Sequence, residues 1–206
     1  DVTVAYFYAG STNPFTYTTD GSTITLTGYT GAGGAVTLPS TLDGLPVTVI
    51  GANAFPGNSG LTGVFIPSSI TNIGDNAFGS CANLTSVFFG GNAPAGISMT
   101  AFSSTSATVY FLRNTSGWGT TFAGRPTLLW DPLVKRDSSF GFAANRFGFT
   151  ITGSNNIPVV VEACTNLTAG VWVPLTNATL GTSGSLYFSD PSSGAKPDSY
   201  YRIVWP

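Results

Sequence analysis

A stretch of about 23 residues recurs within the first half of the chain. The sequence VIGANAF at 49–55 returns as NIGDNAF at 72–78, and LTGV at 61–64 returns as LTSV at 84–87 with the same offset. A fixed period in this range is typical of stacked repeats, in which each unit buries its apolar face only against its neighbours. The repeat therefore predicts a short solenoid.

The repeat consensus is Ile-Pro-x-x-Ile-x-x-Ile-Gly-x-x-Ala-Phe, followed by Leu-x-x-Val. We expect each apolar position to point inward and to stack on its counterpart in the next coil. Ala54 and Ala77 are small enough to let a short helical turn approach a core filled by Phe55 and Phe78. A weaker copy at 96–102 brings the total to about two and a half to three coils, which is near the minimum for stability.

These residues resemble the BspA-type (Treponema pallidum-type) leucine-rich repeat. The likeness covers roughly residues 15–130 and includes the closing stretches at 107–110, 117–120 and 125–130. The resemblance implies a strand plus a short irregular or helical segment in each repeat. It also implies a secreted or surface protein of bacteria, because most such proteins lie there and several are linked to adhesion. Many relatives stack far more coils than this chain does.

The segment before the repeats is apolar. In residues 2–8 (VTVAYFY) both sets of alternating positions are mainly apolar, and a strand of that kind is normally buried on both faces. Two outcomes remain open: the segment caps the first coil of its own chain, or it adds to an open sheet edge of another copy. We therefore treat residues 1–14 as an N-terminal strand and a possible donor strand. The candidate self-assembly residues are Val2, Val4, Tyr6, Phe7 and Tyr8.

The last part of the chain departs from the repeat. Residues 131–146 are interpreted as a linker or a first docking strand, and residues 147–206 as a small β-sandwich, because short apolar runs alternate with turn-rich segments. This region is similar to a C-terminal module of secreted bacterial proteins. The predicted fold class is thus mostly β, with N-terminal strands, a leucine-rich-repeat domain at 15–130 and the sandwich. The expected sandwich strands are 147–152, 158–163, 171–175, 185–188 and 200–205.

Composition excludes several classes of partner. Charged residues make up 8% of the chain, and residues 1–112 contain no Lys or Arg, whereas nucleic-acid binding needs clustered basic side chains. No run of 18 or more apolar residues is present, so we predict no membrane span. Low charge with abundant Ser, Thr and aromatic residues suits an extracellular β-protein. A removed signal peptide would explain the start at Asp1, as would a trimmed chain.

The residues needed for most catalysis are missing. The chain has no histidine, which removes Ser-His-Asp and Cys-His systems and His-based metal sites. Cys81 and Cys164 are interpreted as small buried hydrophobic residues. Glu162 is the single glutamate, and we expect it to pair with an arginine such as Arg202 or to face water. We predict no enzyme, no catalytic residue, no metal and no cofactor.

Two features of the sequence could involve glycans. Exposed aromatic rings could stack on sugars, and Asn-x-Ser/Thr sequons could carry N-glycans in a secreted chain, although their number is close to chance. The aromatic candidates are Tyr6, Tyr8, Tyr29, Trp118, Trp172 and Trp205. The sequons are at Asn83, Asn114, Asn166 and Asn177.

These observations favour an extracellular bacterial structural protein that self-associates by β-strand addition, as a filament or surface-layer subunit whose partners are other copies of itself. The alternative is a surface adhesin module that binds host protein or glycan. An enzyme is the third and least favoured hypothesis.

Overall fold

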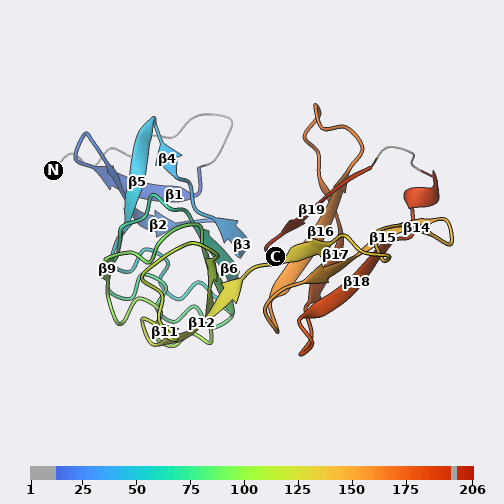
Figure 1. Ribbon diagram of the computed structural model, residues 1–206. Coiled ribbons are helices and arrows are strands. Elements are labelled where there is room, and N and C mark those ends of the chain that lie inside the picture. The colour runs from blue at the N-terminus through green and yellow to red at the C-terminus, as the bar shows by residue number, and fades with distance from the viewer. Residues whose placement is uncertain (1–12, 196–198) are drawn as a thin grey trace. The chain divides into compact units, whose positions relative to one another are not determined.

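The computed structural model describes residues 13–195 and 199–206, and the chain divides into two compact units (Figure 1). We call Asp1–Leu128 the repeat unit and Leu129–Pro206 the C-terminal unit. Apart from one 3-10 turn, η1 (Ser193–Ala195), every regular element of the described residues is a β-strand. The predicted fold class, a short solenoid followed by a β-sandwich, is confirmed. The N-terminal strand predicted within residues 1–14 falls almost wholly outside the described residues.

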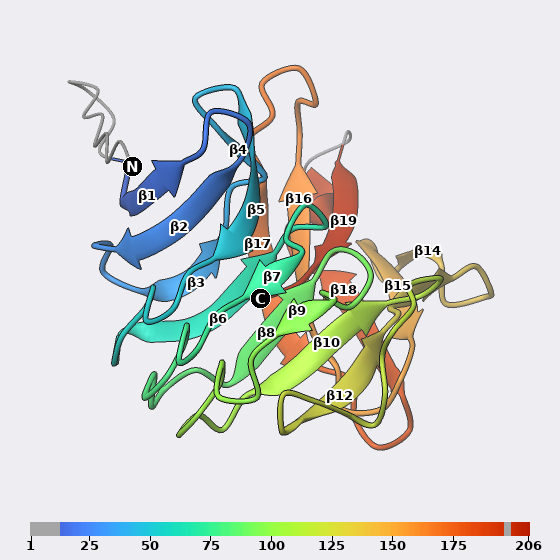
Figure 2. The ribbon, with the colours of Figure 1, turned by 90° about the vertical axis from the view of Figure 1, so that its left-hand side faces the viewer.

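The repeat unit contains two sheets whose strands follow one another coil by coil (Figure 2). The first sheet has the order β1-β2-β5-β7-β9, with β4 beside β5, and the second has the order β11-β12-β10-β8-β6-β3. The first sheet comprises β1 (Phe15–Thr19), β2 (Ile24–Tyr29), β4 (Thr41–Leu42), β5 (Leu45–Ile50), β7 (Asn72–Ile73) and β9 (Gly96–Ile97). The second comprises β3 (Gly34–Thr37), β6 (Leu61–Ile66), β8 (Ser86–Phe89), β10 (Thr108–Leu112), β11 (Thr121–Phe122) and β12 (Arg125–Trp130).

The first two strands form a hairpin. β1 and β2 pair antiparallel across a turn at Asp20, whose carboxylate accepts hydrogen bonds from the backbone N–H groups of Ser22 (2.8 Å) and Thr23 (2.7 Å). These bonds lower the pKa of Asp20. Asp in a turn commonly bonds the backbone two or three residues ahead, so this carboxylate has a structural role.

The repeat period sets the strand register. β6, β8 and β10 run parallel, and Val64 lies beside Val87, which lies beside Val109. All three valines are fully buried. Equivalent positions of successive repeats therefore form continuous apolar columns, as a solenoid requires.

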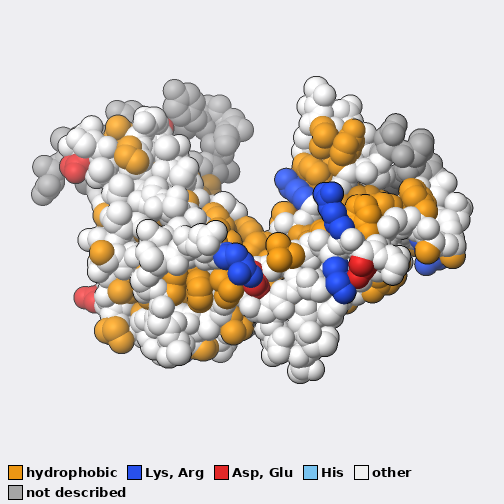
Figure 3. Space-filling model, viewed as in Figure 1, with side chains coloured by type: hydrophobic (Ala, Val, Ile, Leu, Met, Phe, Trp, Pro, Cys, Tyr) orange, Lys and Arg blue, Asp and Glu red, His pale blue; other side chains and the backbone are white. Residues whose placement is uncertain are grey.

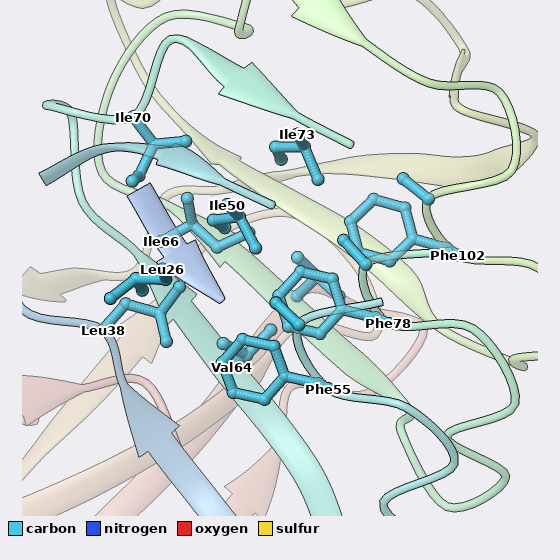
Figure 4. Packing of buried hydrophobic residues seen from close by; sticks show 14 of the residues in the cluster. Leu26, Leu38, Ile50, Phe55, Val64, Ile66, Ile70, Ile73, Phe78 and Phe102 are labelled. Carbon is cyan, nitrogen blue, oxygen red and sulfur yellow. The ribbon is translucent and has the colours of Figure 1, made fainter. Parts of the chain in front are cut away.

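The phenylalanines of the repeat form a second column (Figure 4). The Phe55 and Phe78 ring centroids are 4.7 Å apart and those of Phe78 and Phe102 5.4 Å apart, with interplanar angles of 18° and 10°. The short helical turn expected beside them is not formed: these residues make turns. The Phe55 N–H bonds the Ala77 carbonyl in the next coil, and the Phe78 N–H bonds the Ala101 carbonyl, both at 2.8 Å. Bonds between coils thus replace bonds within a helix.

Close approach between coils explains the repeated glycine. A Cβ atom added to Gly74 would lie 2.6 Å from the Ala52 nitrogen, and one on Gly51 would lie 2.8 Å from the Leu26 carbonyl oxygen. Real Cβ atoms do not approach backbone so closely, so the consensus Gly is a packing requirement.

The C-terminal unit is a sandwich of two antiparallel sheets. Phe147 on one sheet stacks on Tyr201 of the other, with centroids 5.1 Å apart. In the first of these sheets, β15 pairs with β13 and β14 along one edge and with β18 along the other; the second has the order β17-β16-β19. The strands are β13 (Leu133–Lys135), β14 (Gly141–Ala143), β15 (Arg146–Thr152), β16 (Pro158–Cys164), β17 (Val173–Thr179), β18 (Ser185–Asp190) and β19 (Tyr200–Val204).

The linker interpretation of residues 131–146 is corrected by this pairing. Leu133–Lys135 pair with one half of β15 and Gly141–Ala143 with the other half, so both segments belong to the sandwich. A first docking strand, the other interpretation, describes these residues better. Backbone pairing with β15 determines their structure, and their own short apolar runs do not reveal it.

Candidate functional site

The described residues contain no cluster of three or more His, Cys, Asp or Glu side chains that could hold a metal ion. Glu162 pairs with Arg202, with its Oε2 atom 2.6 Å from Nη2 and 2.7 Å from Nε, as predicted. The Arg202 guanidinium also lies 4.3 Å from the Trp172 ring centroid. This carboxylate is therefore engaged in an ion pair.

Both cysteines are buried and free, as interpreted from the sequence. The Cys81 thiol donates to the Phe55 carbonyl at 3.0 Å, and burial raises the pKa of this thiol. A buried thiol with a raised pKa is a poor nucleophile. Cys81 therefore acts as a small core residue.

A groove of about 470 Å³ lies in the C-terminal unit. Its volume lies in the range of ordinary ligand clefts. We call it the edge groove, because its walls come from β13 and the following loop on one side and from β19 on the other. The lining residues that matter below are Leu133, Val134, Phe140, Phe149, Tyr201 and Ile203.

The walls of the edge groove are apolar and exposed. Leu133 is 58% exposed and Phe140 44% exposed, while Phe149 at the base is buried. Figure 3 shows apolar side chains gathered on the C-terminal unit beside several Lys and Arg side chains. Single exposed apolar residues are ordinary, whereas a contiguous cluster usually marks a contact surface.

The base of the groove is held by a part-buried hydrogen bond. The Tyr201 hydroxyl donates to Asp190 Oδ2 at 2.9 Å, and Asp190 also accepts from the Ser192 N–H at 2.7 Å. Burial of the phenol, followed by the bond to Asp190, raises the pKa of Tyr201 to about 12. The hydrogen bond to Asp190 holds the Tyr201 ring at the base of the groove.

The groove is bordered by two sheet edges. β19 pairs with β16 from Tyr200 to Val204, and no strand within residues 13–195 and 199–206 pairs with its other side. β13 pairs with β15 and likewise has no second strand partner there. An unpaired edge presents backbone donors and acceptors to an incoming strand. Apolar walls and an open backbone edge therefore coincide.

Two arginines lie at the rim of the groove, and Arg202 is ion-paired with Glu162. Arg136 and Arg202 both line the groove, and the Arg136 guanidinium lies 5.9 Å from the Phe140 ring centroid. Lys135 lies next to Arg136 in sequence and pairs with Asp137 at 3.0 Å. An apolar or acidic segment suits this rim better than a basic one.

None of the candidate aromatic rings or sequon asparagines that the structure describes lines this groove. Val2, Val4, Tyr6, Phe7 and Tyr8 lie outside the described residues. Among the proposed sugar-stacking rings, Tyr29 and Trp118 pack against the core of the repeat unit, and Trp172 lies beneath Arg202. Leu133, Val134 and Phe140 were missed, although their apolar character within an expected linker was an available signal.

The four sequon asparagines, at 83, 114, 166 and 177, are all exposed. Asn83 donates through Nδ2 to the Ser59 carbonyl at 2.8 Å, and Asn166 accepts from the Thr168 N–H at 2.9 Å. Glycosylation at these positions stays a prediction.

No helix in the described part of the chain is both long and apolar enough to cross a membrane.

Comparison with known proteins identifies the repeats. Residues 35–117 match the model of the BspA type leucine rich repeat region (6 copies). This is the family predicted from the sequence, within the wider limits of 15–130. No curated protein matches the chain.

Three solved bacterial structures are similar to part of the chain. A leucine rich repeat protein of T. pallidum is 35% identical over 47% of this chain and 40% of its own, with a TM-score of 0.36. A leucine rich cell surface protein of Faecalibacterium prausnitzii is 29% identical over 51% and 27%, with a TM-score of 0.36. A leucine-rich repeat protein of Bacteroides capillosus is 28% identical over 50% and 69%, with a TM-score of 0.34. The chain thus spans less than half of the first two proteins.

Proposed function

We propose that this chain, whose residues 35–117 are a BspA-type leucine-rich repeat region, is a subunit of an extracellular bacterial assembly that self-associates through β-strand addition. The observation that carries the proposal is the edge groove, in which apolar walls meet unpaired strand edges. The same chain carries an apolar segment at residues 2–8. One molecule therefore contains both an acceptor surface and a strand of matching chemistry.

The repeat region and the composition support a location at or outside the cell surface. Charged residues are 8% of the chain, whereas soluble domains average about 25%. Such a protein presents mostly hydroxyl, amide and apolar groups to its surroundings, and long-range charge repulsion between copies is weak at a net charge of −2.

The geometry of strand addition favours open assemblies. A donor segment on one copy and an acceptor edge on the next make a heterologous contact, in which two different surfaces meet. Heterologous contacts form rings when the rotation closes and filaments when it does not. A filament follows from this contact without a second interface, whereas a surface layer would need a second interface between filaments.

The proposal is tested by measuring the mass of the assembled protein. We expect the full chain to form concentration-dependent higher species in analytical ultracentrifugation and extended particles in negative-stain microscopy. A chain lacking residues 1–10 is expected to sediment as a monomer with an unchanged circular dichroism spectrum. A full chain that stays monomeric at all concentrations would contradict the proposal.

The alternative, an adhesin module for host protein or glycan, has less structural support. Tyr29 and Trp118 pack against the core, so these two rings do not form a sugar-stacking platform. A glycan array probed with the full chain decides the glycan form of this alternative, since specific hits would favour an adhesin.

A further inference from the structure

We infer that the edge groove is the acceptor site, and that it receives residues 2–8 of a second copy as a strand added to β19. This inference rests on the proposed function and names the contact through which it would operate. Strand addition combines main-chain hydrogen bonds at an open edge with pockets for alternate side chains, and the edge groove offers both.

The length of the donor segment fits the edge. β19 has five residues, from Tyr200 to Val204, and a strand rises about 3.4 Å per residue, so the edge is roughly 17 Å long. Residues 2–8 form a longer apolar run, followed by Gly10 and then by Pro14. The Pro14 carbonyl accepts a hydrogen bond from the Thr30 N–H at 2.8 Å, so the chain that follows residues 2–8 is anchored to the repeat unit at Pro14.

The side chains fit as well. In a strand, residues 2, 4, 6 and 8 share one face, and in this chain they are Val, Val, Tyr and Tyr. The groove offers Leu133, Val134 and Phe140 along one wall and aromatic rings at its base. At about 30 Å³ of liquid volume per water molecule, 470 Å³ corresponds to many waters and gives room for several side chains.

The charges are also compatible. Residues 1–19 contain one charged side chain, Asp1, and no Lys or Arg. The groove rim carries Arg136 and Arg202. A neutral or acidic donor segment therefore meets no repulsion at the rim, whereas a basic segment would.

Two full-length variants separate donor from acceptor. Val4→Asp/Tyr6→Asp places carboxylates on the inserted face of the donor and leaves the groove intact. Leu133→Asp/Phe140→Asp places carboxylates on the groove walls and leaves the donor intact. The second pair alters exposed positions, and Leu133→Asp alone is a milder version in case the double change disturbs folding. Val171→Asp is the matched control, because Val171 is 66% exposed in the same unit and does not line this groove.

We expect each double variant alone to sediment as a monomer and an equimolar mixture to form a 1:1 heterodimer. Leu133→Asp alone is expected to weaken self-association by about tenfold or more, since the carboxylate would lose its hydration in an apolar contact. Val171→Asp is expected to assemble like the unaltered chain. Melting curves of all variants show whether the fold is retained.

Other outcomes overturn the inference in distinguishable ways. If the donor variant is monomeric while both groove variants, each with a normal melting curve, assemble normally, self-association stands and this acceptor site is wrong. If the unaltered chain is monomeric, the proposed function fails. The double variant Tyr6→Cys/Ile203→Cys then tests whether residues 2–8 bind the edge groove of their own chain. A disulfide formed within single chains would show that they do.

Discussion

The two units bury their aromatic residues in different ways. In the repeat unit, Phe55, Phe78 and Phe102 form a column in which all three side chains are almost completely inaccessible. In the C-terminal unit, Phe149 is buried, but Phe140 beside it is 44% exposed at the wall of an open groove. A repeat supplies each ring with a partner one period away. In the sandwich, β13 and β19 each have one side without a strand partner among the described residues.

The largest expected effect tests the closed column. Phe78→Ala removes the central ring between Phe55 and Phe102 and leaves a cavity, so we expect the repeat unit to lose about 3–5 kcal/mol of stability. Denaturant unfolding measures this loss, with near-ultraviolet circular dichroism following the aromatic residues. The control, Phe142→Ala, changes a ring that is 64% exposed and is expected to shift stability by about 0.5 kcal/mol or less. Equal losses for both variants would remove the contrast between the units.

A second prediction concerns the close approach of coils. Gly74→Ala would place a methyl group 2.6 Å from the Ala52 nitrogen, and we expect the resulting backbone shift to cost about 1–3 kcal/mol. Gly181→Ala is the matched control, because nothing lies within 4 Å of its added Cβ atom. Thermal unfolding of both variants compares the two costs. A Gly74→Ala chain as stable as the unaltered one would show that the coils can separate freely.

The third prediction concerns the base of the groove. Since the folded-state pKa of Tyr201 is raised from 10.0 to about 12, the folded state retains a proton that the unfolded chain releases. This contribution is fully present below pH 10 and is lost as the pH rises from about 10 to 12. Tyr201→Phe should flatten that decline, which denaturant titrations at successive pH values would measure. Identical pH profiles for the two chains would mean that folding does not raise the pKa of Tyr201.

The smallest effect is expected at the surface ion pair. Glu162 and Arg202 form a hydrogen-bonded pair, yet the Arg202 side chain is 47% exposed, so we expect a coupling energy of about 1 kcal/mol or less. A double-mutant cycle with Glu162→Gln and Arg202→Met measures it, and 1 M salt should reduce it. A coupling several times larger would show that this sheet is held together by charge more than by its apolar core.

The packing of the repeated positions was predicted well, because each of these residues packs against the equivalent residues of the neighbouring repeats. The offset between Gly51 and Gly74 indicated that coils stack there, and the structure explains why glycine is required. The Glu162–Arg202 pair was also anticipated. The expected helical turns were wrong, because bonds to the next coil satisfy the backbone of Phe55 and Phe78.

The candidate site was harder to predict. Leu133 and Phe140 looked like parts of a linker, since a two- or three-residue apolar run has no periodicity of its own. Pairing with β15, which follows them in the chain, makes them walls of a groove. The groove also requires β19, some 65 residues further along the chain, to lie opposite them. No local sequence pattern indicates that these two segments come together.

The amino-acid sequence by itself determined the solenoid, its period, the low charge and the absence of histidine chemistry, because these properties are local or repeat at a fixed spacing. Tertiary structure alone decided which strands lie at sheet edges, which apolar residues stay exposed, and where Tyr201 meets Asp190. Such features depend on pairing between distant segments, since an edge exists only where no other strand has docked.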